Sequence, residues 1–248
     1  MNIPEKLIEL RRIMDRENIA AYIISGTDPH NSEYLPAPWQ QRKWISGFTG
    51  SYGTVVVTKN EAGLWTDTRY FIQAEKELAG SGIKLHKLRV PDAVDYPQWL
   101  VEVLESGTKV GIDGFCMSVS DVRNLKNALS PKNITIQKQI DLLGEMWFDR
   151  PALPVEKIIR LDTKYVGESA GERIGKIREF IRYNHGDAML FSCLDEIAWL
   201  YNIRCNDIAY NPVAISYAIV EKDKAHLFIK LDKISQEIDQ QLFSAREE

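Results

Sequence analysis

The sequence feature that most limits the fold is a β-hairpin pattern followed by alternating helix and strand patterns. Val55-Val56-Val57 and Leu64-Trp65-Thr66 flank the turn residues of 60–63, which predicts the hairpin. Helical spacing is found over 70–78, 96–105 and 118–129, and it alternates with strand-like runs over 83–89, 109–113 and 134–139. Such a series predicts an α/β fold with a mixed sheet flanked by helices.

The pattern stops at two prolines and then begins again. Pro151 and Pro154 lie in a stretch, 147–162, that has no clear period, so we expect one domain over 1–150 and a second over 151–248. The elements expected in the second domain are a helix from Ser169 to Asn184, a strand over 187–193, a helix over 194–203, paired strands over 215–220 and 225–230, and a last helix from near Asp232. A helix over 4–16 and a strand over 20–24 open the first domain in the same order, so we expect two similar domains.

Charge and residue inventory exclude several classes of function. The chain has 31 basic and 35 acidic residues and a net charge of -4, which does not favour a nucleic acid or a membrane surface as partner. Three cysteines, at 116, 193 and 205, fit neither a disulfide framework nor a cysteine zinc site and favour a cytoplasmic protein. The four histidines are far apart in the sequence, so we expect no metal site in this chain.

Few residues are candidates for chemistry. Arg69 follows the hairpin beside aromatic residues, where a guanidinium can bind a carboxylate through paired hydrogen bonds, although spacing alone favours a surface ion pair. His30 is a weaker candidate, because the polar residues of its loop, 28–34, typically bond their own backbone. Asp195 and Glu196 begin a helix, where capping explains both charges.

Several short motifs, taken in order, resemble one family. They are Ala21-Tyr22-Ile23-Ile24, His30-x-Ser32-Glu33-Tyr34, Ile45-Ser46-Gly47-Phe48-x-Gly50-Ser51, Leu64-Trp65-Thr66-Asp67-x-Arg69-Tyr70-Phe71, Val110-Gly111-Ile112-Asp113, Trp147-x-Asp149-Arg150-Pro151, Leu194-Asp195-Glu196-Ile197-Ala198-Trp199-Leu200-Tyr201-Asn202 and Asn211-Pro212-Val213. The chain is similar to the N-terminal portion of large, three-domain Xaa-Pro aminopeptidases of the creatinase/prolidase group. The resemblance implies two domains of the creatinase/prolidase N-terminal type.

The resemblance also implies an activity, which is the release of an N-terminal residue that precedes proline. In that family two divalent ions, commonly manganese, act in a C-terminal catalytic domain that this chain does not include. The resemblance therefore implies no catalytic residue in this chain, and a role in substrate access, substrate contacts and assembly, for which Arg69 is the first candidate and His30 the weaker one. The implied partners are proline-containing peptides, the protein's own catalytic domain and a second copy in a homodimer.

By the same resemblance the second domain is incomplete, and we expect the chain to be an isolated piece or the product of a truncated gene. Two alternatives stay open. One is a stand-alone binding module without hydrolase activity, and the other is part of a prolidase or creatinase relative.

Overall fold

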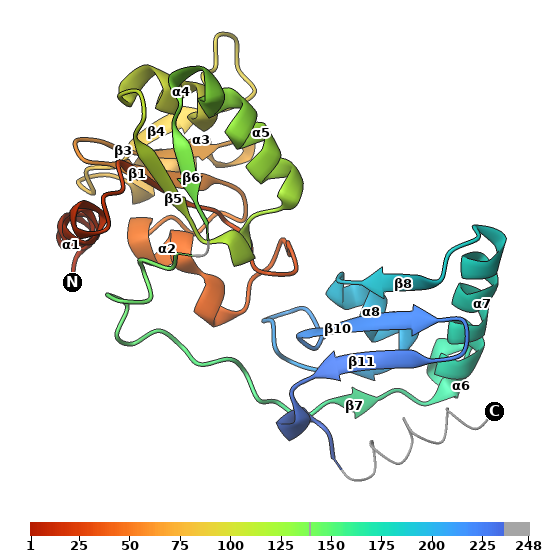
Figure 1. The fold of residues 1–248 in the computed structure, drawn as a ribbon. Coiled ribbons are helices and arrows are strands. Elements are labelled where there is room, and N and C mark those ends of the chain that lie inside the picture. The colour runs from red at the N-terminus through yellow and green to blue at the C-terminus, as the bar shows by residue number, and fades with distance from the viewer. Residues whose placement is uncertain (139, 236–248) are drawn as a thin grey trace. The chain divides into compact units, whose positions relative to one another are not determined.

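Two separate units make up the chain, Met1–Pro151 and Ala152–Glu248, and each has its own sheet and core (Figure 1). The computed structural model describes residues 1–138 and 140–235. None of the helices in these ranges is both long enough and apolar enough to cross a membrane. Short 3-10 turns connect several elements, at Ala37–Trp39, Thr68–Tyr70, Gly114–Cys116, Ser130–Lys132 and Leu231–Lys233.

A six-stranded mixed sheet forms the centre of the first unit, as the sequence predicts. Its strands are β1 (Ala21–Ile24), β2 (Thr54–Thr58), β3 (Ala62–Thr66), β4 (Lys84–Lys87), β5 (Lys109–Ile112) and β6 (Thr135–Gln137), in the order β4-β3-β2-β1-β5-β6. Strand β2 is antiparallel to both neighbours, and all other pairings are parallel. The C-terminal ends of β3 and β4 and the N-terminal end of β2 therefore share one edge of the sheet.

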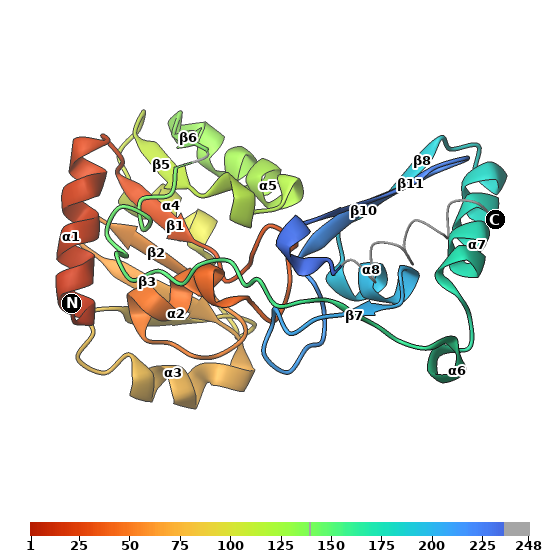
Figure 2. The same cartoon turned by 90° about the horizontal axis from the view of Figure 1, so that it is seen from below.

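Helices cover both faces of this sheet (Figure 2). The helices α1 (Ile3–Arg16), α2 (Gln41–Ser46) and α3 (Phe71–Glu77) pack on one face, and α4 (Tyr96–Val103) and α5 (Val119–Leu129) pack on the other. Within β1, Tyr22 and Ile24 point to the first core while Ala21 and Ile23 point to the second, because side chains alternate along a strand. Burial on both faces explains why the strand reads as an unbroken apolar run.

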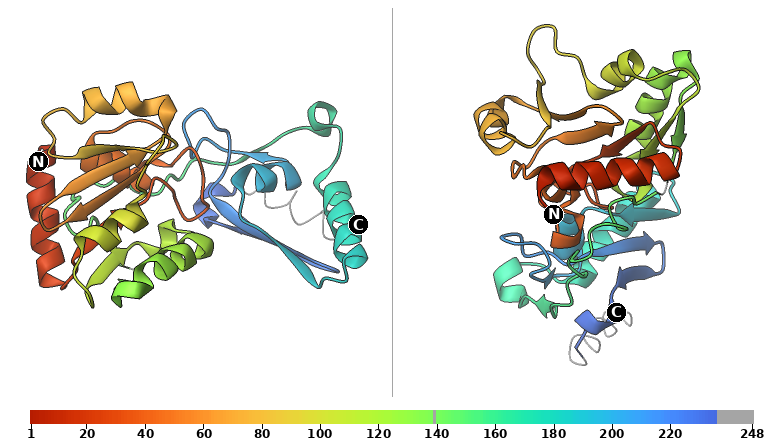
Figure 3. Two further views of the ribbon diagram at one scale, coloured as in Figure 1. Left: turned by 90° about the horizontal axis from the view of Figure 1, so that it is seen from above. Right: turned by 90° about the vertical axis from the view of Figure 1, so that its left-hand side faces the viewer.

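A three-stranded antiparallel sheet forms the second unit. Its order is β11-β10-β8, with β8 at Ala188–Phe191, β10 at Ser216–Glu221 and β11 at Ala225–Ile229. The helices α7 (Ala170–Tyr183) and α8 (Leu194–Leu200) pack on the sheet through a core that includes Ile181, Ile197 and Val220 (Figure 3). A short helix, α6 (Thr163–Val166), and a two-stranded sheet of β7 (Ile159–Arg160) and β9 (Ile203–Arg204) complete the unit.

The two units share a topology, which confirms the prediction of two similar domains. In the first unit the series α1, β1, α2, β2, β3 gives the sheet order β3-β2-β1. In the second the series α7, β8, α8, β10, β11 gives the order β11-β10-β8, again with antiparallel neighbours.

Some elements differ from the sequence prediction. The predicted helix over 194–203 is wrong at its end, because Asn202 has a left-handed φ of 56° and Ile203–Arg204 instead pairs with Ile159–Arg160. Helices α2 and α6 and strand β7 have no clear sequence signal, since each has only two to six residues. Where the sequence predicts a helix from near Asp232, the structure has the 3-10 turn Leu231–Lys233, which ends in extended backbone at Ile234. The part of that prediction beyond residue 235 lies outside the described residues.

Candidate functional site

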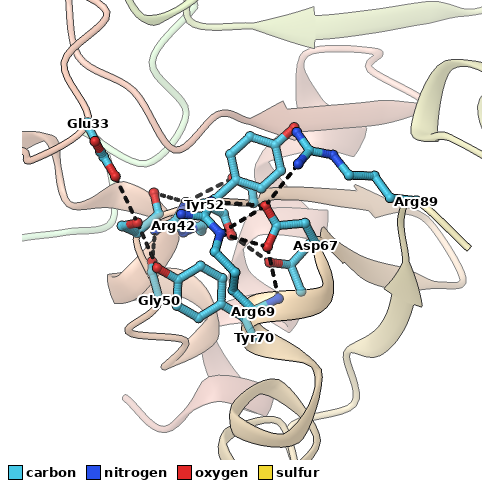
Figure 4. A network of polar contacts seen from close by, with 11 residues as sticks. Glu33, Arg42, Gly50, Tyr52, Asp67, Arg69, Tyr70 and Arg89 are labelled. Carbon is cyan, nitrogen blue, oxygen red and sulfur yellow. Dashed lines mark hydrogen bonds and ion pairs between the residues drawn. The ribbon is translucent and has the colours of Figure 1, made fainter.

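The candidate site lies at the sheet edge where β3 and β4 end and β2 begins. Asp67 and Arg69 directly follow β3, Arg89 follows β4, and Tyr52 precedes β2. The strand order, with β4 and β2 on either side of β3, brings these three segments together although they are distant in the sequence. Figure 4 shows the resulting group of polar and aromatic side chains.

A buried carboxylate fixes the candidate Arg69. The Asp67 side chain accepts from the backbone N–H of Arg69 at 3.1 Å, which caps the 3-10 turn Thr68–Tyr70. It also accepts from Arg69 Nε at 3.0 Å and from Arg69 Nη2 at 2.9 Å, so the guanidinium is held by paired hydrogen bonds. Asp67 is 1% exposed and Arg69 is 55% exposed. The hydrogen bonds from Arg69 hold the pKa of Asp67 below its ordinary value although burial raises it.

A second arginine lies on the other side of this carboxylate. Arg89 Nη1 is 3.9 Å from Asp67 Oδ2, and the Arg89 side chain is 71% exposed. Both guanidiniums contact the ring of Tyr52, with Arg69 Cζ at 5.9 Å and Arg89 Cζ at 5.8 Å from its centroid. Arg69 Cζ also lies 5.1 Å from the centroid of the Tyr70 ring. The site therefore holds two cations, one buried anion and two aromatic rings, of which Tyr52 is shared by both cations.

A buried arginine, Arg42, holds the loop that carries Tyr52. Arg42 donates through Nη1 to the carbonyls of Gly53 at 3.0 Å and Ser51 at 3.4 Å, and through Nη2 to the carbonyl of Gly50. Burial lowers the pKa of Arg42 to about 10. Because one side chain binds three carbonyls of the loop, it fixes the backbone on both sides of Tyr52.

Hydrogen bonds extend this group toward the surface. The hydroxyls of Tyr70 and Ser51 are 2.8 Å apart, and Ser51 Oγ donates to Glu33 Oε1 at 3.5 Å. Glu33 is exposed, and its charge adds weakly to that of Asp67 in raising the pKa of Arg69. The bond that Glu33 accepts from Ser51 is long, and among the described residues Glu33 has no ion pair with either arginine.

A pocket of about 270 Å³ adjoins the arginines at Tyr52. Trp65 and Leu88 supply apolar walls, and Asp95 and Asp121 supply carboxylates. Burial raises the pKa of Tyr96, which also lines the pocket, to about 12, and Asp121 and Asp95 add to this shift. The pocket is electronegative, so an anion bound at this edge is expected on the arginine side of Tyr52.

The other sequence candidates have local explanations. His30 is buried, and its backbone N–H donates to Asp28 Oδ1 at 3.0 Å, as does that of Ser32 at 2.9 Å. These bonds are the loop-stabilising kind that the sequence suggests for 28–34. A binding role for His30 stays a prediction. Asp195 and Glu196 lie in the first turn of α8, whose polarity favours acids.

No metal centre is formed by the side chains that the structure describes. Among residues 1–138 and 140–235, no group of three or more His, Cys, Asp and Glu side chains could hold an ion. The three cysteines are free thiols, of which Cys116 and Cys205 are buried and Cys193 is exposed.

Sequence reasoning found Arg69 but missed Arg42, Arg89 and Tyr52. Tyr52 lies in a glycine-containing turn and Arg89 at the end of a predicted strand, and Arg42, inside the short helix α2, has no sequence signal. Their roles depend on which strands are neighbours, and that order is not encoded locally.

Both units are similar to domains of known proteins. Residues 6–143 and residues 149–247 each match a family model described as the Creatinase/Prolidase N-terminal domain. Aminopeptidase P2 of Arabidopsis thaliana is 39% identical over 98% of this chain, which covers 35% of that protein. Xaa-Pro aminopeptidase 1 of Dictyostelium discoideum is 39% identical over 97% of this chain, which covers 40% of that protein.

A solved structure is also similar over almost the whole chain. The X-prolyl aminopeptidase of Caenorhabditis elegans, described as a cytosolic enzyme with a di-nuclear active site, superposes with a TM-score of 0.93. It is 34% identical and matches 99% of this chain, which covers 42% of that enzyme. The chain thus spans well under half the length of these relatives.

Proposed function

Because this chain belongs to the creatinase/prolidase N-terminal domain family, we propose that it is the non-catalytic N-terminal part of a metal-dependent Xaa-Pro aminopeptidase. The observation that carries this proposal is the match to Xaa-Pro aminopeptidases along nearly the full chain, at 34–39% identity in the three relatives described above. The proposed reaction is hydrolysis of the bond between an N-terminal residue and proline.

The metal chemistry is assigned to a domain outside this sequence. The C. elegans relative has a di-nuclear active site, and we propose two divalent ions, manganese by preference, in the corresponding catalytic domain. The described residues of this chain do not fit such a pair, because they contain no cluster of three ligating side chains. No chemical step is therefore assigned to them.

The proposed role of this chain is to contact substrate at the edge of its first sheet where β3 and β4 end. Two metal ions can activate water and polarise a carbonyl, but they do not recognise the rest of the peptide. A guanidinium can do so, since its planar fork bonds carboxylates and carbonyls in pairs. Arg69 has its Nε and Nη2 edge on Asp67, and this contact orients the group. We propose that the Arg69 guanidinium binds the part of the substrate peptide that follows proline.

Location and assembly follow from the same relationship. We propose a cytoplasmic protein, in line with the cytosolic C. elegans relative, and an assembly in which this chain adjoins its own catalytic domain and a second copy. A stand-alone binding module remains the second candidate. It is favoured only by the absence of a metal cluster among the described residues.

The test compares this chain with the longer protein that contains it. We expect the purified longer protein to release the residue before proline in the presence of manganese. The 248-residue chain should neither cleave Xaa-Pro peptides nor bind two manganese ions tightly in a calorimetric titration. Turnover by the short chain, or an inactive longer protein that binds two ions, would contradict the proposal.

A further inference from the structure

Arg89 occupies a backbone conformation that disfavours its side chain. Its φ is +59°, in the left-handed region that glycine adopts freely and that a residue with a Cβ adopts at a cost. Strained backbone of this kind is concentrated at functional sites. The position just after β4 therefore carries an arginine where a glycine would suit the backbone better.

The Arg89 guanidinium has little to bind within the protein. Among the described residues it makes no hydrogen bond, and its ion pair with Asp67 is long, at 3.9 Å. Asp67 already accepts from the backbone N–H, Nε and Nη2 of Arg69. One buried carboxylate therefore faces two guanidiniums, and the group of Asp67, Arg69 and Arg89 has a net positive charge beside the ring of Tyr52. The exposed Glu33 acts only weakly on Arg69.

Arg69 also has guanidinium N–H donors that are not used within the described part of the chain. Its bonds to Asp67 use the Nε and Nη2 edge, and no bond from its Nη1 is found among the described residues. A guanidinium held along this edge can still offer its Nη1 and Nη2 end to a second carboxylate. Both guanidiniums lie within 6 Å of the centre of the Tyr52 ring, with Arg69 Cζ at 5.9 Å and Arg89 Cζ at 5.8 Å, so one ligand beside this ring can reach both.

We propose that Arg69 and Arg89 jointly bind a carboxylate at the ring of Tyr52, with Asp67 as the positioning residue that orients Arg69 without touching the ligand. This inference rests on the proposed function, since the ligand is then the C-terminal carboxylate of a peptide that follows proline. The neighbouring pocket with Asp95 and Asp121 repels that carboxylate and leaves the arginine side of Tyr52 as its place.

The variant Arg89→Gly tests this directly. Glycine suits a φ of +59°, so the variant should be at least as stable as the parent chain while it lacks the guanidinium. The probes are the tripeptide Ala-Pro-Ala with a free C-terminal carboxylate and the same tripeptide as its C-terminal amide. Binding to the isotope-labelled 248-residue chain is followed by the arginine Nε–H resonances.

We expect the carboxylate form to shift the Nε–H signals of Arg69 and Arg89 and to bind about tenfold more tightly than the amide, a difference of about 1.4 kcal/mol. Arg89→Gly should remove that difference and Arg89→Lys should restore part of it. The control Arg123→Gln, at an exposed position on α5, should change nothing.

Equal binding of the two tripeptides, absent binding, or a carboxylate preference that survives in Arg89→Gly would overturn the proposal. The measurement uses no enzymatic activity. An inactive longer protein would therefore refute the aminopeptidase assignment but not the carboxylate site. Equal binding of the two tripeptides would refute the carboxylate site but not the aminopeptidase assignment.

Discussion

Gly26 is the position at which one added methyl group should do most damage to the candidate site. It directly follows β1, and a Cβ built there would lie 2.0 Å from Arg42 Nη1 and 2.7 Å from the carbonyl oxygen of Gly53. Neither distance is compatible with a real contact. Its own φ is not left-handed, so alanine suits the Gly26 backbone and the effect of Gly26→Ala comes from the contact alone.

The size of the effect follows from what Arg42 would lose. Its guanidinium is buried and donates to the carbonyls of Gly50, Ser51 and Gly53, and moving it leaves some of these groups without a partner. A hydrogen bond that involves a charged group contributes about 1.5–3 kcal/mol, and overpacking costs about 1–3 kcal/mol. We therefore expect Gly26→Ala to lower the free energy of unfolding of the first unit by about 2–5 kcal/mol.

Urea unfolding followed by tryptophan fluorescence measures this change. Of the six tryptophans only Trp199 lies after Pro151, so the other five report on the first unit. With a urea dependence of about 2 kcal/mol/M, the midpoint should fall by about 1–2.5 M.

The matched control is Gly80→Ala. Gly80 has a φ of +73° and open space where its Cβ would lie, so the substitution should cost only about 1–2 kcal/mol of backbone strain. A Gly26→Ala midpoint within error of the parent chain, or no lower than that of Gly80→Ala, would refute the contact argument.

Three further predictions concern other parts of the chain. Native protein should show one reactive thiol, Cys193, because the other two cysteines are buried. Partial burial raises the pKa of Cys193, so its labelling near neutral pH should be slow. Three equally fast thiols in a disulfide-exchange assay would contradict this. The lowered pKa of Asp67 means that its ionised form stabilises the fold above the carboxyl's unfolded-state pKa, and this contribution is lost as pH falls through the lower folded-state value. Urea midpoints from pH 7 to pH 2 should therefore fall less in Asp67→Asn than in the parent chain, and parallel curves would argue against it. Gly175→Ala, inside α7 and free of clashes, should raise stability by about 0.5–1 kcal/mol in thermal unfolding, and a loss would show an unseen contact.

The strands were predictable because their signal is local. Val55-Val56-Val57 and the apolar run of β1 are buried on both faces of one sheet, and such strands read as continuous apolar segments. The helix that begins after Ser169 was equally clear, since Ser169 and Glu172 form a full capping box. The mixed character of the sheet followed from a hairpin joined to alternating helices and strands.

The site was only partly predictable for a physical reason. Asp67 and Arg69 are two residues apart, so their pairing is a local property of the turn after β3. Arg89 and Tyr52 join them only because β4 and β2 flank β3, and a sheet order is not encoded in any short segment. The same limit hid β7 and β9, whose two residues each are strands only because they pair with one another.

The most direct test of the central claim is a peptide length series with Arg69 variants of the longer protein that contains this chain. If the first unit contacts the peptide beyond proline, Arg69→Ala should leave folding, metal content and the hydrolysis of Xaa-Pro dipeptides intact. It should lower kcat/KM for tripeptides and longer substrates by about ten- to a hundredfold, and Arg69→Lys should recover only part of that loss. An unchanged kcat/KM for tripeptides and longer substrates would contradict the account and leave Arg69 as a partner of Asp67 alone.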